Sequence, residues 1–237
     1  MSAVALLEFR NVRKTYVLGN DHVRAVDGVS LAIDAGEVVA LYGPSGSGKS
    51  TLLRIAAAID PPDEGMVLVD GQDVTRLAPK AAAAYRMHML GWIHQDAQLD
   101  EGATVLENAA IKHLVASRSV REGHRQVIPL LDELGLSERL DHRAETLSSG
   151  ERQRVMIAQA LSLEPRVLLA DEPTGNLNSR LGEEVLTLLR EQTRRRSMAT
   201  VLVTHDERAA AFADRVYALR DGVLHDVDRE ADVRTWA

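Results

Sequence analysis

Short apolar runs and longer stretches of helical periodicity alternate along the chain. The runs at residues 38–42, 167–170 and 200–204 are apolar at almost every position, which is typical of parallel strands buried on both faces. Further strands are predicted at residues 4–9, 29–33, 66–69, 216–219 and 223–226. One Asp-Gly pair follows the run at 66–69, and a second separates the last two runs and predicts a tight hairpin.

Apolar residues recur with the period of an α-helix between these runs. Helices are predicted at residues 48–58, 104–116, 121–134, 151–163 and 181–194. Strands and helices alternate at both ends of the chain, which predicts an α/β sheet. Residues 96–163 are almost wholly helical in pattern, so we expect a mostly helical subdomain inserted into the sheet domain.

The amino-acid composition limits the classes of protein to which the chain could belong. Of 237 residues, 45% are hydrophobic and 27% charged, as in a globular domain, and the net charge is −7. Negative charge and few aromatic residues argue against direct nucleic acid binding, since that needs cations and stacking surfaces. The absence of cysteine excludes disulfides, thiolate metal sites and a cysteine nucleophile. No targeting segment or apolar run of ~20 residues is recognised, so we expect any membrane role to come through a partner.

A glycine-rich segment lies between a predicted buried strand and a predicted helix. Its sequence GPSGSGKST fits G-x-x-x-x-G-K-[ST], in which glycines let successive backbone N–H groups turn around a phosphate. Lys49 is placed to reach the β and γ phosphates of a nucleotide, and Ser50 to bind Mg²⁺. The structural alternative is an accidental glycine-rich turn. The predicted nucleotide-binding residues here are Gly43, Pro44, Ser45, Gly46, Ser47, Gly48, Lys49, Ser50 and Thr51.

Two carboxylates follow the buried run at residues 167–170, at the sheet edge where ligands of α/β proteins bind. Asp171 is expected to hold Mg²⁺ through its water shell. Glu172 points differently along the chain and is expected to polarise an attacking water. The alternative is a pair of solvated carboxylates at a strand end.

Five motifs follow one another in order. After the glycine-rich segment come Gln95, LSSGERQR at residues 147–154, DEPTGNLN at 171–178 and THD at 204–206. The ordered set resembles the ATP-binding cassette of ABC transporters, and the likeness covers essentially the whole chain. It implies an α/β fold with a P-loop NTPase core, a mostly parallel sheet, N-terminal antiparallel strands and an inserted helical subdomain. We expect one domain over residues 1–237, with the core at 1–95 and 164–237 and the helical subdomain at 96–163.

The resemblance implies a role for each motif. Tyr16 resembles the aromatic residue that stacks on adenine, and Gln95 the glutamine that senses Mg²⁺ and the γ-phosphate. His205 resembles the switch histidine. The signature motif, which contacts the γ-phosphate held by the other subunit, includes Ser148, Ser149, Gly150 and Glu151. The implied catalytic residues are Lys49, Gln95, Glu172 and His205, and the implied Mg²⁺ ligands are Ser50, Gln95 and Asp171.

Several of these residues also have a structural interpretation. Tyr16 could be an ordinary tyrosine at a strand end, and a histidine such as His205 is by itself more often structural. Ser148 and Glu151 have the spacing of a capping box at a helix start. Both interpretations can hold there, because a capped helix start presents free N–H groups to an anion. The basic run at 194–196 is interpreted as a solvated helix end.

The motif set also predicts an assembly, because each chain carries one phosphate cradle and one signature. In the family, the signature of one copy completes the cradle of the other. We therefore expect a homodimer, or a heterodimer with a similar chain, that encloses ATP and Mg²⁺. The sequence departs from the family pattern at Ser149, where the family has glycine, at Asn178, where it has Asp, and at His94. These departures predict an active but slow ATPase.

The function implied by the resemblance is an ATPase subunit that drives a separate transmembrane permease. The motif DEPTGNLN and the compact length resemble the branch that serves lipoprotein release, macrolide and antimicrobial-peptide export, and cell division. We expect a cytoplasmic protein held at the inner face of the cell membrane by its permease. Two alternatives stay open: an ABC ATPase that regulates a membrane partner without transport, and a soluble ABC ATPase with no transport role.

Overall fold

The central sheet has six strands in the order β10-β9-β3-β8-β7-β6, in a computed structural model that describes residues 5–19, 21–95, 99–117, 119–175 and 177–227. Every neighbouring pair is parallel except β9 and β10, which form an antiparallel hairpin. The strands are β3 (Val38–Tyr42), β6 (Leu90–Ile93), β7 (Val167–Asp171), β8 (Ala199–Thr204), β9 (Arg215–Arg220) and β10 (Val223–Asp226). The predicted mostly parallel sheet is confirmed.

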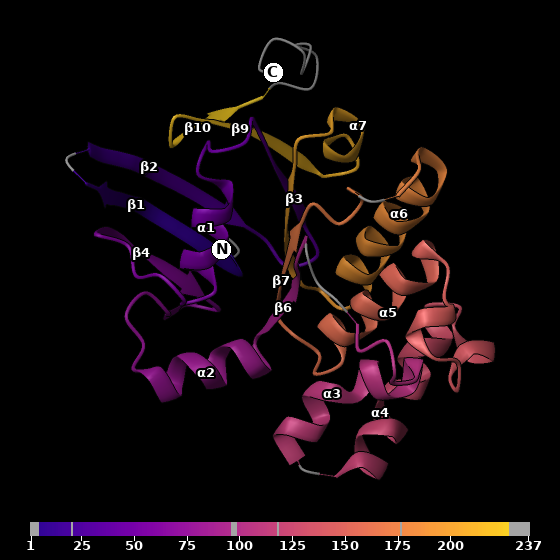
Figure 1. Ribbon diagram of the computed structural model, residues 1–237. Helices are drawn as coiled ribbons and strands as arrows, with labels where there is room; N and C mark the ends of the chain where they lie inside the picture. The colour runs from indigo at the N-terminus through magenta and orange to yellow at the C-terminus, as the bar shows by residue number, and fades with distance from the viewer. Residues whose placement is uncertain (1–4, 20, 96–98, 118, 176, 228–237) are drawn as a thin grey trace.

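A second, antiparallel sheet has the order β2-β1-β4-β5. Its strands are β1 (Leu7–Leu18), β2 (Asp21–Ile33), β4 (Glu64–Val69) and β5 (Gln72–Asp73). Helix α1 (Lys49–Ala56) packs between the two sheets (Figure 1), where Leu52, Leu53 and Ile55 are buried. The antiparallel N-terminal strands agree with the prediction.

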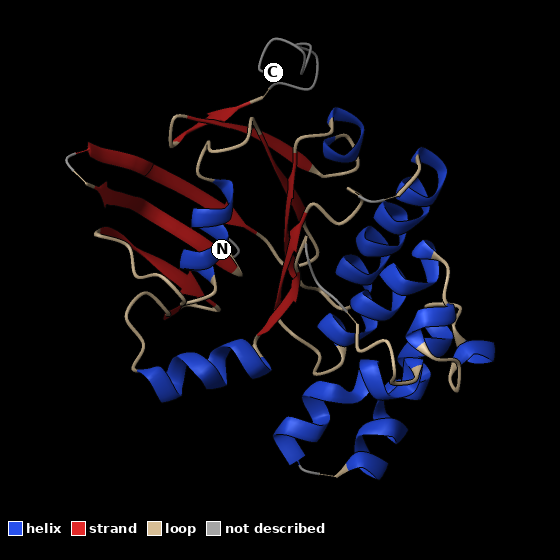
Figure 2. Cartoon of the chain, in the orientation of Figure 1, coloured by secondary structure: helices blue, strands red, loops and turns tan. Residues whose placement is uncertain are grey.

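Helices cover the other face of the central sheet (Figure 2). They are α3 (Val105–Ser117), α4 (Val120–Glu133), α5 (Ser149–Leu161), α6 (Ser179–Arg195) and the short α7 (Glu207–Ala210), joined in part by 3₁₀ turns at Ser137–Arg139 and Ala144–Thr146. Strand β3 supplies both cores, because Val39 and Leu41 face α1 while Val38 and Ala40 face the helices. This two-sided burial explains its unbroken apolar sequence.

Several predicted boundaries were wrong. Strands β1 and β2 extend well beyond the apolar runs at 4–9 and 29–33, because their polar ends pair with each other across a long ladder. Residue 4 and residues 228–237 lie outside the described part of the chain. Strand β6 and helix α2 (Pro79–His88) were not predicted. Gly91 interrupts the apolar pattern of β6, where a Cβ would lie 2.9 Å from the Ala160 carbonyl oxygen.

Both Asp-Gly pairs form two-residue hairpins, β4–β5 and β9–β10. All four residues have positive φ, which suits the primed turn that a twisted hairpin needs. The basic run at 194–196 is not simply solvated, since Arg195 and Arg196 both pair with Glu133 of α4. Within the described residues, no helix combines the length and apolar character of a membrane span.

Candidate functional site

The carboxyl ends of β3, β6, β7 and β8 meet at one edge of the central sheet. The loops that leave these ends, together with β1 and β2, surround a cavity of about 650 Å³. Its lining residues are Tyr16, Ala25, Pro44, Ser45, Gly46, Gly48, Lys49, Ser50, Thr51, Gln95, Asp171, Glu172, Val203 and His205. Residues from four of the five predicted motifs are therefore brought together, as expected for the ligand edge of a parallel sheet.

The glycine-rich segment wraps tightly between β3 and α1. A Cβ on Gly48 would lie 1.9 Å from the carbonyl oxygen of Ala25, and one on Gly43 would lie 2.2 Å from that of Leu219. Both glycines have positive φ. Gly43 and Ser47 do not line the cavity; Ser47 is buried, and its backbone contacts Pro44 and Gly222. These two predicted residues therefore shape the loop from behind.

Lys49 lies at the first position of α1 with its side chain folded into this loop. Its Nζ donates to the carbonyl oxygens of Gly43 at 2.6 Å and Pro44 at 2.7 Å, and to Ser47 Oγ at 3.4 Å. Burial lowers the pKa of Lys49, while the charges of Glu172 and Asp171 act in the opposite direction. The direct hydrogen-bond partners of the ammonium are neutral oxygen atoms, so a charged Lys49 at this loop favours an anionic ligand such as a phosphate.

Glu172 and His205 contact each other across the ends of β7 and β8. Oε1 of Glu172 lies 2.6 Å from Nδ1 of His205, and Thr204 Oγ1 donates to Oε2 at 3.2 Å. Glu172 has φ 48°, a left-handed conformation for a non-glycine residue. That backbone turns its side chain toward His205 as the strand ends. The contact places a carboxylate and an imidazole side by side over the cavity.

Ser50, Gln95 and Asp171 present oxygen atoms to the same cavity. Among the described residues there is no cluster of three or more His, Cys, Asp or Glu side chains that would hold a metal ion alone. Mg²⁺ commonly takes one or two protein carboxylates and fills its remaining positions with water and substrate phosphates. The hard oxygen donors here fit that pattern and do not fit a zinc site.

Tyr16 lies near the end of β1 and lines the cavity. Its ring is partly exposed, and its hydroxyl donates to Oδ2 of Asp60 at 3.1 Å. Burial, followed by the Asp60 carboxylate, raises the pKa of the Tyr16 phenol. The ring is thus held by its hydroxyl at the wall of the cavity.

The signature residues lie apart from this cavity, at the start of α5. Ser148 Oγ accepts from the backbone N–H of Glu151 at 3.3 Å, and Glu151 Oε2 accepts from the Ser148 N–H at 2.9 Å and from its hydroxyl at 2.7 Å. The predicted capping box is therefore present. An ion pair with Arg139 Nε at 2.8 Å, then the bonds from Ser148, lower the pKa of Glu151 to about 2. The N–H groups of Ser149 and Gly150, in the first turn, have no partner within the helix.

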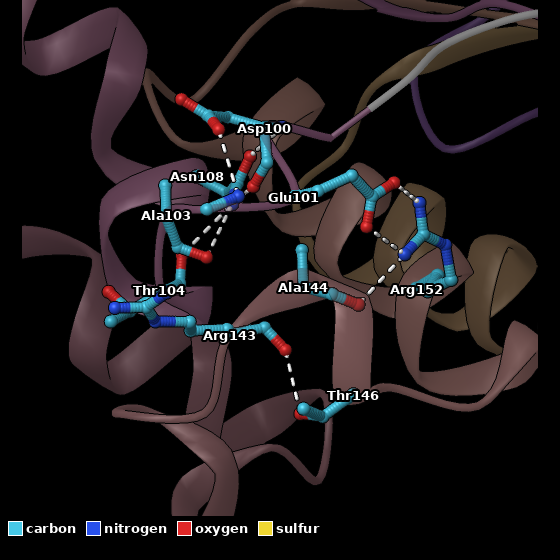
Figure 3. A network of polar contacts seen from close by, with 10 residues as sticks. Asp100, Glu101, Ala103, Thr104, Asn108, Arg143, Ala144, Thr146 and Arg152 are labelled. Carbon is cyan, nitrogen blue, oxygen red and sulfur yellow. Dashed lines mark hydrogen bonds and ion pairs between the residues drawn. The ribbon is translucent and has the colours of Figure 1, made fainter.

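The segment at residues 100–108 is tied to this helix by a polar network (Figure 3). Arg152 of α5 donates to both carboxylate oxygens of Glu101, at 2.8 and 2.5 Å, and to the Ala144 carbonyl at 2.8 Å. Asn108 of α3 bonds the backbone of Asp100 in both directions. Two-pronged Arg–carboxylate contacts fix geometry as well as charge. The network therefore positions the start of α5 relative to residues 100–108.

Two departures from the family pattern have local explanations. Asn178 is the N-cap of α6, where its Oδ1 accepts from the Leu181 N–H at 3.0 Å, so the neutral side chain still caps the helix. His94 stacks on Trp92 with ring centroids 4.2 Å apart. Burial, with a smaller effect from the charge of Lys112, lowers the pKa of His94.

Sequence reasoning missed three residues that contact the predicted ones. Thr204, which bonds Glu172, lies inside the THD motif and was recognisable there. Asp60 and Arg139 lie outside every motif, and no local pattern marks them. Only the fold brings them to Tyr16 and Glu151.

The chain is similar in sequence to known ATP-binding proteins of transport systems. Residues 26–175 match the family model described as ABC transporter. The chain is 42% identical over 229 residues to the macrolide export ATP-binding/permease protein MacB of Rhodopirellula baltica, covering 95% of this chain and 34% of that protein. It therefore spans about a third of that relative. It is also 42% identical over 219 residues to the lipoprotein-releasing system ATP-binding protein LolD of Hahella chejuensis, covering 92% of this chain and 95% of that one.

The fold is also similar to that of a solved ATP-binding cassette. A dimeric ATP-binding cassette in a post-hydrolysis state, bound to ADP and Pi, superposes with a TM-score of 0.81 at 34% identity. The match covers 94% of this chain and 99% of that cassette.

Proposed function

Because the chain belongs to the ABC transporter family, we propose that it is an ATP-hydrolysing subunit that drives a transmembrane permease. The observation that carries this proposal is the single cavity that joins the Lys49 cradle to the Glu172–His205 contact. One end of that cavity suits the phosphates of a nucleotide, and the other holds groups able to handle a water proton. The similarity to LolD and MacB supports assignment to a lipoprotein-release or export branch.

Different residues of the cavity have different roles in ATP hydrolysis. Glycine-loop N–H groups and Lys49 neutralise charge on the phosphoryl oxygens. Glu172 orients the attacking water and takes its proton, while His205 and Thr204 hold the carboxylate in place. Mg²⁺, when bound by Ser50, Asp171 and Gln95, would supply further charge neutralisation. Tyr16 provides a surface on which the adenine ring stacks.

We propose that the active unit is a dimer of cassettes, either of two identical chains or with a similar chain. The Ser148–Glu151 turn lies outside the cavity of its own chain, so it is available to a nucleotide bound by a partner. The N–H groups of Ser149 and Gly150, which have no partner within the helix, suit a phosphate there. We also propose that the chain divides into a core at 1–95 and 164–237 and a helical subdomain at 96–163.

The permease would dock on the helical subdomain, at the inner face of the cell membrane. A groove of about 690 Å³ lies beside α3 and α4 and includes Asp100 and Asn108 of the network that follows Gln95. The large apolar side chains of Ile111, Leu114 and Val120 line it, although they are 39–51% exposed. Exposed apolar side chains gathered in a groove are typical of a protein–protein contact.

The test of this function is Glu172→Gln. We expect ATP binding to persist, an ATP-dependent dimer to accumulate in gel filtration, and turnover to fall by about 10²- to 10⁴-fold, the usual contribution of a general base. Glu164→Gln is the matched control, since Glu164 is exposed and also has a left-handed φ of 52° but lies outside the cavity. Full hydrolysis by Glu172→Gln would remove the carboxylate from this role.

A further inference from the structure

A set of polar contacts ties the distal half of β1 to the loop that follows α1. The backbone N–H of Thr15 donates to Asp63 Oδ2 at 2.7 Å, and the Asp63 N–H donates to the Arg13 carbonyl at 2.8 Å. Lys14 Nζ donates to the Pro61 carbonyl at 2.8 Å and to Asp63 Oδ1 at 3.2 Å. This loop therefore fixes the path of β1 at Arg13, Lys14 and Thr15, immediately before Tyr16.

Within this loop, Asp60 connects the Tyr16 side chain to α1. Its Oδ2 accepts from the Tyr16 hydroxyl at 3.1 Å and from Arg54 Nε at 2.7 Å, while Oδ1 accepts from Arg54 Nη2 at 3.3 Å. Arg54 lies in the last turn of α1, whose first residue is Lys49. One carboxylate thus links the aromatic wall of the cavity to the helix that carries the phosphate-binding lysine.

The Asp60 side chain is 23% exposed and that of Arg54 is 51% exposed, so their ion pair contributes little to the free energy of unfolding. Their effect is on orientation. The Tyr16 ring is partly exposed on one side, with Lys14 Nζ 5.5 Å from its centroid. The side chain of Thr51, in α1, also hydrogen-bonds the Tyr16 phenol. With Asp60 removed, the contact with Thr51 would be left to hold the hydroxyl, so the ring would gain rotamer freedom.

We propose that Asp60 is a positioning residue for the nucleotide base. By accepting the Tyr16 hydroxyl, it holds the ring in the orientation that stacks on adenine, and through Arg54 it keeps that ring at a fixed place relative to the phosphate cradle. A preorganised ring loses less conformational freedom when the nucleotide binds, so binding is tighter. The inference rests on the proposed ATPase function and adds a residue that no motif contains.

The test compares ligands with and without a base. For Asp60→Ala we expect the KM for ATP to rise about 2- to 10-fold, the range of one net hydrogen bond, with kcat unchanged within about twofold. The inhibition constant of inorganic tripolyphosphate, which has the phosphates but no base, should stay the same. Asp60→Asn, which keeps an acceptor oxygen, should recover part of the loss.

Two further variants separate positioning from general damage. In a Tyr16→Phe background, which keeps the ring and lacks the hydroxyl, Asp60→Ala should raise KM no further. Glu64→Ala breaks a comparable surface ion pair of β1, with Arg13, and should leave both ligands unaffected. Equal weakening of ATP and tripolyphosphate, or additive effects of the two changes, would overturn the inference. A wild-type protein that binds ATP no better than Lys49→Ala would instead overturn the proposed function.

Discussion

Replacing Glu151 with alanine tests how far the start of α5 depends on one partly buried ionic contact, that of Glu151 with Arg139. The folded protein lowers the pKa of this carboxyl from 4.5 to about 2 through Arg139 and Ser148. Since a tenfold change in proton affinity is worth about 1.4 kcal/mol, the interactions amount to ~3 kcal/mol as an upper bound. The Arg139 side chain is 43% exposed, so solvent screening reduces its share. We therefore expect Glu151→Ala to lower the free energy of unfolding by about 2 kcal/mol at pH 7.

The sign of the pH dependence follows from the direction of the pKa change. A carboxyl with a lowered pKa stabilises the fold fully above its unfolded value of 4.5, and the contribution disappears as the pH falls through the folded value near 2. The difference between wild type and Glu151→Ala should therefore shrink to about half near pH 3. Urea unfolding followed by circular dichroism, repeated from pH 7 to pH 3, measures this difference.

The control for this experiment is Glu145→Ala, which removes an exposed carboxylate from the turn just before α5. It should change the free energy of unfolding by less than about 0.5 kcal/mol, as surface substitutions usually do. A loss from Glu151→Ala that is the same at every pH, or no larger than that of the control, would refute the reasoning.

Two other predictions test the cradle and the groove. In urea unfolding, Gly48→Ala should destabilise the protein by at least about 2 kcal/mol more than Gly46→Ala. A Cβ on Gly48 would lie 1.9 Å from the Ala25 carbonyl oxygen, whereas a Cβ on Gly46 would have nothing within 4 Å. Gly46→Ala therefore adds only the strain of a left-handed backbone. Equal losses would show that the loop relaxes. Ile111→Gln combined with Leu114→Gln should reduce recovery of the chain with the membrane fraction of cells that co-express its permease, and should leave the ATPase rate of the isolated chain unchanged. The control Val115→Gln alters an exposed side chain of the same helix outside the groove, so a similar reduction there would argue against the docking surface.

The sequence allowed prediction of the features that repeat over several residues. The strands β3, β7 and β8 are apolar at almost every position because both faces are covered, and the glycine-lysine motif needs no tertiary context to be recognised. Strand β6 and the polar ends of β1 and β2 were missed, since partner strands rather than side-chain pattern hold them in place.

The same distinction applies to the site. Motif order indicated which residues gather at the sheet edge, and the cavity contains most of them. The contacts that orient these residues were not predictable, because Asp60 is distant in sequence from Tyr16, as Glu172 is from His205. Arg139 and Glu151 are twelve positions apart, and that spacing matches no helical or strand repeat.

The left-handed backbone at Glu172 means that the residue needed for activity is not the residue that this conformation favours for stability. An L-residue in that conformation costs roughly 1–2 kcal/mol that glycine would avoid. Glycine at this position would therefore remove the backbone strain together with the carboxylate that we propose activates water and its contacts with Thr204 and His205. A library of variants sorted only for thermal resistance should enrich inactive chains at residue 172, so directed evolution of this protein needs a turnover readout from its first round.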